Sequence, residues 1–251
     1  MAIPAYTITE VLNELDQIVE NSIRLSDAKG IFAYIYRRTT AQIKLGILGH
    51  AFENPERMEK LDVIFANRYL KSYDDYKNGK EISNCWKTAF EANSDKLCIM
   101  QHILLGMNAH INLDLGVAAA DLMVGKPILE LENDFIKVNR ILSGLTDEMQ
   151  ERVAMVSPLM FLLDWVGGRK DEELIGFSMG KAREQSWNTA TQVWALKGEE
   201  RIEKIREIDL LVDGIAKLII NPELRLVNLV TKVVRTTENH NVNKIIETLK
   251  A

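Results

Sequence analysis

The strongest constraint on the fold is one long segment, Leu97 to Val124, that contains no lysine or arginine and only two acidic residues, Asp114 and Asp121. A helix that is apolar on all sides lies either in the middle of a large domain or in a membrane. The segment is long enough to span a bilayer. It carries ionisable and amide side chains that are costly in lipid, however, and the chain has no second segment like it. We therefore expect a buried central helix and no membrane span.

The rest of the chain also has helical rather than alternating hydrophobic periodicity. Thr7 followed by Glu10 predicts a capping box at the start of the first helix. Asn54, Pro55 and Glu56 predict the start of another, because they supply a cap, a proline at the first helical position and an acid near the helix dipole. We predict separate helices near residues 130–142 and 146–164. The expected fold is all-α: a single domain, residues 1–251, packed around the central helix, with residues 165–171 as its one possible division.

Charge and cysteine content narrow the functional classes. The formal net charge is -5, and the lysines and arginines are scattered, so we expect no nucleic-acid partner. Cys85 and Cys98 stand in apolar helical surroundings without a CxxC spacing, which is typical of a reducing compartment. The first twenty residues lack a basic segment followed by an apolar one. These features predict a cytoplasmic protein.

Two polar stripes follow the central helix. At about 100° per residue, His102, His110 and Asp114 fall within about 120° of one another, and three amides, Gln101, Asn108 and Asn112, fall on the opposite side. Buried polar groups cost free energy unless they are hydrogen-bonded or bind a ligand. We therefore expect partners for both stripes from neighbouring helices or from a cofactor.

The first stripe suggests a metal site. His110 and Asp114 stand four residues apart, close enough on a helix for one nitrogen and one oxygen ligand to a single ion. Asp62, the lone acid in the apolar run LDVIFA, is the leading candidate for a third ligand. Such a set would suit Zn, Fe or Mn. His102 lies about 12 Å upstream and would play a supporting role. The alternative is a structural His110–Asp114 hydrogen bond, with Asp62 paired to Arg68 or another cation.

The string QHILLGMNAHINLDLG at residues 101–116 resembles the signature of a largely bacterial family, domain of unknown function 5995. The likeness extends to residues 61–76 and, more loosely, to residues 182–190 and 235–249. It implies a helical fold and a site on the central helix, and it brings no established activity. The positions that match the family pattern are Asp62, Asn67, Asn108, His110, Asn112 and Asp114, with Arg183 and Trp187 matching less closely.

These observations lead to one main functional hypothesis. The chain would be a metal-dependent enzyme, most simply a hydrolase, acting on a small or amphipathic substrate in a pocket of the helical bundle. His110, Asp114 and Asp62 would bind the metal, Asn108 would orient substrate or water, and Arg183 would contact an anionic group. Asn67, Asn112, His102 and Trp187 would support the site.

Other functions stay open at this point. The chain could be a non-catalytic helical module that binds an apolar ligand or a protein partner, with the polar stripes as a structural network. Asp74 and Asp75 resemble the acidic pair of isoprenoid-type enzymes, although no partner motif follows them. Iron-dependent oxidation is a further option, but the chain lacks the paired ExxH motifs of di-iron bundles.

Overall fold

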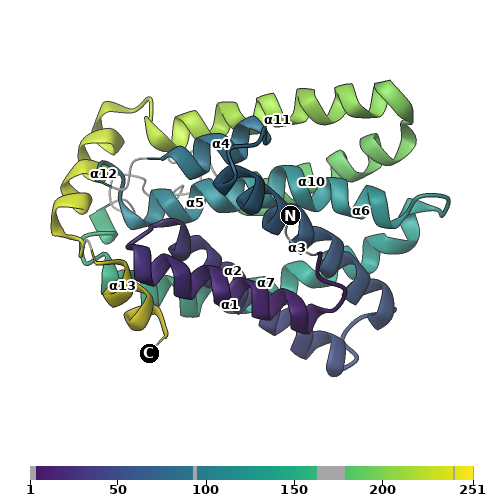
Figure 1. The fold of residues 1–251 in the computed structure, drawn as a ribbon, viewed down its shortest axis with the longest axis horizontal. Helices are drawn as coiled ribbons and strands as arrows, with labels where there is room; N and C mark the ends of the chain where they lie inside the picture. Colours follow the sequence, from purple (N-terminus) through teal and green to yellow (C-terminus); the bar gives the residue numbers. More distant parts are fainter. Residues whose placement is uncertain (1–3, 93–94, 163–178, 240, 251) are drawn as a thin grey trace.

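A computed structural model describes residues 4–92, 95–162, 179–239 and 241–250 (Figure 1). Across these ranges the chain forms helices joined by short turns and contains no β-strand, so the all-α prediction is confirmed. In chain order the elements are α1 (Ile8–Leu25), α2 (Lys29–Leu48), α3 (Pro55–Lys77), α4 (Asn84–Glu91), α5 (Ile99–Ala109), η1 (His110–Leu115), α6 (Gly116–Leu122), η2 (Ile128–Leu131), α7 (Glu132–Val156), α10 (Met179–Ala195), α11 (Gly198–Ile220), α12 (Arg225–Thr237) and α13 (Val242–Lys250).

The predicted central helix is present as α5, η1 and α6, which run without a break from Ile99 to Leu122. By length and composition this helix could cross a membrane, but 89% of its most apolar window is buried inside the protein. It crosses the middle of the view in Figure 1, with the long α11 along the top and α1 below. Helices α2, α4 and α11 pack on α5, whereas α3 and α10 pack on η1 and α6. The apolar segment therefore forms the core of a helical protein.

Local capping signals place several helix ends where the sequence predicts them. The Thr7 hydroxyl accepts a hydrogen bond from the Glu10 amide, and the Glu10 carboxylate accepts one from the Thr7 amide. The Asn54 side chain accepts one from the Arg57 amide, with Pro55 as the first residue of α3. These caps satisfy amides that a helix N-terminus otherwise leaves unpaired.

Distant residues cap the central helix. The Ile99 amide donates to a carboxylate oxygen of Glu238, just beyond α12, at 2.9 Å. At the other end, the Trp194 indole nitrogen donates to the carbonyls of Met123 and Lys126, both at 3.0 Å. The core helix is thus held at both ends by the second half of the chain.

One prediction about the helices is wrong. Residues 132–156 form a single helix, α7, rather than two helices separated near residue 144. One glycine within a helix costs only about 1 kcal/mol, which is too little to end it. The helix ends instead at Val156, because Pro158 disfavours helical geometry at Ser157. The possible domain division at residues 165–171 lies outside the described residues.

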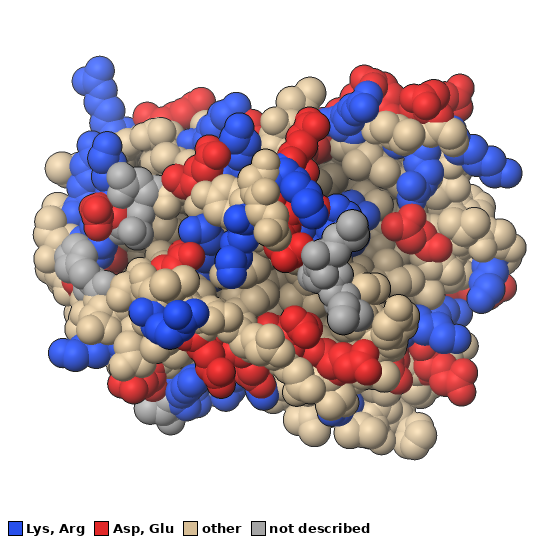
Figure 2. Space-filling view, in the orientation of Figure 1, with Lys and Arg blue, Asp and Glu red and all other residues tan. Residues whose placement is uncertain are grey.

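Charged side chains of both signs are mixed over the face of the molecule shown in Figure 2. Lysines and arginines alternate there with aspartates and glutamates and do not gather into one extended basic patch. This face therefore offers no continuous positive surface of the kind that a phosphate backbone requires.

Candidate functional site

The middle of the central helix is π-helical, from His110 to Leu115. Such wider turns are rare in proteins and occur frequently at functional sites. Here the segment carries His110, Asn112 and Asp114, and all three side chains are buried. His110 Nδ1 lies 3.2 Å from an oxygen of Asp114, which is the hydrogen bond that the structural alternative expects.

Asp114 is the centre of a network that joins three helices. Its carboxylate accepts hydrogen bonds from Trp86 Nε1 at 2.8 Å and from Arg68 Nε at 3.1 Å, in addition to its contact with His110. Arg68 also reaches Asp121, at 3.8 Å, and Asp121 pairs with Arg201 of α11. The Asp114 charge is therefore well compensated by protein donors.

Aromatic rings enclose His110. The Phe65 ring stacks on the imidazole with centroids 3.6 Å apart, and Tyr36 meets it edge-on at 4.3 Å. Phe32, Tyr69 and Trp86 lie about 6 Å away. This burial lowers the pKa of His110, although its hydrogen bond to Asp114 opposes the shift. His110 is therefore neutral at pH 7, and its Nε2 has no hydrogen-bond partner among the described residues.

Asp62, the expected third metal ligand, is buried on α3. Burial raises its pKa to about 7, with a smaller contribution from the Glu59 charge, and one of its oxygens has no partner in the described ranges. Within those ranges no group of three or more histidine, cysteine, aspartate or glutamate side chains is arranged to hold a metal ion. The alternative pairing of Asp62 with Arg68 is also not observed, because Arg68 binds Asp114 and Asp121.

The amide stripe faces α11. This helix supplies hydrogen-bond partners of the kind that we expected from neighbouring helices. Asn108 donates to the Val212 carbonyl at 2.9 Å and accepts from Asn112 at 2.8 Å. Gln101 donates to the Ile219 carbonyl at 2.7 Å and accepts from the Cys98 amide. Asn108 was expected to orient a substrate or water. Its side-chain amide instead forms hydrogen bonds within the protein.

The remaining predicted residues belong to α3 and α10. Asn67 forms two hydrogen bonds with the backbone of Ala5 and so fastens the N-terminal segment. Trp187 packs its ring against Phe135 at 5.0 Å, in the apolar core. Arg183 is half-buried on α10, the helix that packs on η1 and α6.

The acidic pair of the isoprenoid-type hypothesis is already engaged with the protein. Asp75 is buried and forms ion pairs with Lys71 and Lys80, which lower the pKa of its carboxyl. Asp74 accepts a hydrogen bond from the Asn78 side chain at 3.1 Å. Both carboxylates thus stabilise the end of α3 and the turn that follows it.

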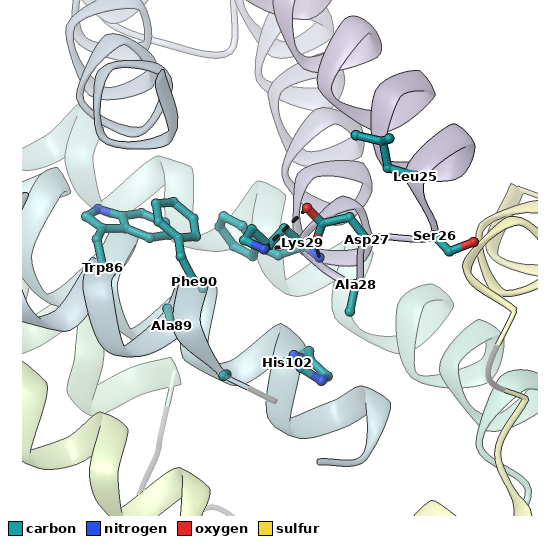
Figure 3. A pocket seen from close by; sticks show the side chains of 12 residues that line it. Leu25, Ser26, Asp27, Ala28, Lys29, Trp86, Ala89, Phe90 and His102 are labelled. Atoms are coloured by element: carbon teal, nitrogen blue, oxygen red, sulfur yellow. Dashed lines mark hydrogen bonds and ion pairs between the residues drawn. The ribbon is translucent and has the colours of Figure 1, made fainter. Parts of the chain in front are cut away.

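A pocket of about 310 Å³ opens beside His102, where α4, α5 and the turn between α1 and α2 meet (Figure 3). Trp86, Ala89 and Phe90 of α4 form one side, and His102 of α5 another. Residues 25–29 of the turn complete the rim, and Phe32 and Gly106 also line the space. His102, for which the sequence predicted a supporting role, therefore lies at the edge of this pocket.

The comparisons with known proteins bear on this geometry. A scan against protein-family models matches residues 8–222 to a family of unknown function, DUF5995. The chain belongs to this family. Neither the search of curated proteins nor that of solved structures found a match.

The DUF5995 match spans α1 to α11 and so includes both the Asp114 network and the His102 pocket. It ends before α12, so the looser likeness expected over residues 235–249 lies outside it. No sequence pattern pointed to Trp86 as a partner of Asp114 or to the turn at residues 25–29 as a pocket rim. Both arise from contacts between segments far apart in the chain.

Proposed function

We propose that this DUF5995 protein is a helical binding module that takes a small amphipathic molecule in the His102 pocket. The observation that carries the proposal is the pocket itself, which lies between the α1–α2 turn, α4 and His102 and has both polar and apolar residues in its lining. Ligand sites are mostly apolar clefts with a few placed polar groups, and about 300 Å³ is the lower end of their usual size. The occupant would therefore be small.

In this proposal the buried polar groups of the central helix have a structural role. Asp114 accepts from three donors, and Asn108 and Gln101 bind carbonyls of α11. A satisfied buried network fixes the register of the helices that it joins. The network would thus hold α4 and α5 in place, and these helices supply Trp86 and His102 to the pocket.

A metal-dependent hydrolase is the second candidate. Two buried atoms favour it, His110 Nε2 and one Asp62 oxygen, because neither has a hydrogen-bond partner in the part of the chain that the structure describes. Zn, Fe or Mn would be the ion, as the nitrogen and oxygen ligands suggest. Elemental analysis of protein purified without added metal separates the candidates, since the hydrolase requires a stoichiometric ion and the binding module requires none.

The binding proposal is tested by filling the pocket. Ala89→Phe adds a ring on the pocket side of α4, whereas Lys87→Phe adds the same ring at an exposed position of that helix and serves as the matched control. Hexanol, hexanoate, indole, indoleacetate and tryptamine are titrated while NMR follows the indole N–H signal of Trp86. We expect at least one probe to shift this signal in the parent and in Lys87→Phe but not in Ala89→Phe. If no probe shifts it in the parent, or if Ala89→Phe binds equally well, the proposal is wrong.

A further inference from the structure

Helix α12 carries an apolar stripe on its outer face. Leu226, Leu229 and Val233 are 53%, 58% and 40% exposed. At about 100° per residue these three side chains fall within about 60° of one another. The opposite face of the helix is buried in an apolar cluster with Cys98 of the central-helix N-terminus. The exposed stripe is therefore additional to the contact that holds α12 on the protein.

Two cations border this stripe. Arg225 and Lys232 stand seven residues apart, on the side of α12 next to Leu229, and both are exposed. Neither forms an ion pair with another residue in the described part of the chain. From its first residue to its last, α12 contains no aspartate or glutamate. The outer face thus combines apolar side chains with positive charge that the protein itself does not compensate.

The charge of this region differs from that of the whole chain. Residues 221–250 contain five lysines and arginines and three acidic residues, whereas the formal net charge of the protein is -5. Helix α12 lies along the left edge of the molecule in Figure 1, with α13 below it. A broad surface can therefore approach α12 from that side and meet the most basic end of an acidic protein.

We propose that the outer face of α12 binds the surface of an anionic lipid membrane. Leu226, Leu229 and Val233 would enter the boundary between headgroups and acyl chains, and Arg225 and Lys232 would contact lipid phosphates. Amphipathic helices that combine exposed leucines with cations bind anionic membranes in this way, parallel to the surface. The inference goes beyond the proposed binding function and does not depend on it.

The charges favour this occupant over a second copy of the chain. Two α12 helices packed face to face would bring four cations together, and neither helix has an acidic residue to pair with them. Like charges in such a contact are destabilising. A membrane that contains phosphatidylserine instead supplies the negative charge that this face lacks.

Cosedimentation of the parent protein with vesicles tests the proposal. One set of vesicles contains phosphatidylcholine alone, and the other contains phosphatidylcholine with phosphatidylserine. Binding should be at least about tenfold tighter to the second set, because two cations contribute. Most of that preference should disappear between about 0.05 M and about 0.5 M salt, because salt screens exposed charges.

Two double variants assign the binding to α12. Leu226→Ser with Leu229→Ser should weaken binding to the anionic vesicles at least about tenfold, and so should Arg225→Gln with Lys232→Gln. All four side chains are exposed, so both variants should keep the circular dichroism spectrum of the parent.

Helix α11 offers a matched control. Leu210 and Leu211 are 61% and 68% exposed, but they follow the acidic residue Glu207 on that helix. Leu210→Ser with Leu211→Ser removes the same two leucine side chains from a different face and should bind the anionic vesicles as the parent does.

A polarity-sensitive dye locates the inserted face. Cys85 and Cys98 are both buried, so a dye that reacts with thiols labels a new exposed cysteine selectively. The emission of a dye on Leu229→Cys should shift to shorter wavelength when anionic vesicles are added, and that of a dye on Leu211→Cys should not.

Several results would overturn the inference. These are equal binding to the two sets of vesicles, no binding to either, or binding that both α12 double variants retain. Sedimentation equilibrium covers the other occupant: a dimer of the parent that Leu226→Ser with Leu229→Ser abolishes would assign this face to a second copy of the chain instead.

Discussion

Replacement of Asp114 by alanine is the most informative perturbation of the central helix. The change removes the acceptor of two buried donors, Trp86 Nε1 at 2.8 Å and His110 Nδ1 at 3.2 Å, and of one partly exposed donor, Arg68 Nε at 3.1 Å. Trp86 and His110 are almost completely buried, so water cannot replace the lost oxygen atoms without entering the core. The Trp86 and His110 donors would remain in place without an acceptor.

The expected loss of stability follows from these contacts. Removing one partner of a buried ion pair costs about 3–5 kcal/mol, and leaving a buried donor unpaired costs about 1–3 kcal/mol. The two terms do not simply add, because the Arg68 side chain is 29% exposed and also reaches Asp121. We therefore expect Asp114→Ala to lower the free energy of unfolding by about 4 kcal/mol. For a chain of this size the melting temperature would fall by about 8–16 °C.

Urea unfolding at pH 7, followed by circular dichroism, measures this loss. Glu20→Ala, which removes an exposed acid of α1, is the control and should change the unfolding free energy by less than about 0.5 kcal/mol. The same titration with a chelator tests the metal hypothesis, since the structural network predicts no effect of chelation on the parent. A loss below about 1 kcal/mol in Asp114→Ala, or a chelator effect as large as the mutation, would refute the reasoning.

Four further predictions concern packing and pH. Gly116→Ala should destabilise the protein by about 1–3 kcal/mol, because its Cβ would lie 2.6 Å from the Ser186 carbonyl oxygen. Gly214→Ala, at an exposed helical position, should stabilise it by about 0.5–1 kcal/mol. Asn108→Ala should cost about 1–3 kcal/mol, because it leaves the Val212 carbonyl and the Asn112 amide without their partner. His102→Leu should remove up to about 3 kcal/mol of pH-dependent stability between pH 4 and 6.5.

Denaturant titrations measure all of these changes. The sign for His102 follows from its depressed pKa: between pH 4 and 6.5 the unfolded chain binds a proton that the folded chain does not, so stability rises with pH over this range. An unchanged slope in His102→Leu would contradict the assignment. Equal effects of the two glycine substitutions would contradict the close approach of α6 and α10, and an Asn108→Ala variant as stable as the parent would contradict the role of the amide stripe.

Much of the fold was predictable because its signals are local. The Thr7–Glu10 box and the Asn54–Pro55 start act within one turn of helix, so the sequence alone locates them. The burial of the central helix follows from its lack of charge. The length of α7 was not predictable in the same way, because a single glycine shifts the balance by too little to decide whether a helix continues.

The site was predictable only where spacing along one helix decides it. His110 and Asp114 form a hydrogen bond because a spacing of four residues places them on the same side of the helix. The amide side chains, once buried, require hydrogen-bond partners, which α11 supplies. Arg68 and Trp86 reach Asp114 across 46 and 28 residues of chain, and no local pattern encodes such contacts. The pocket depends on how the α1–α2 turn meets α4, which is a property of the packed structure.

A crystal structure of the protein grown with indole tests the central claim most directly. The account predicts density for one molecule in the His102 pocket and no metal peak beside His110. An empty pocket, or a metal ion bound between His110 and Asp62, would contradict it.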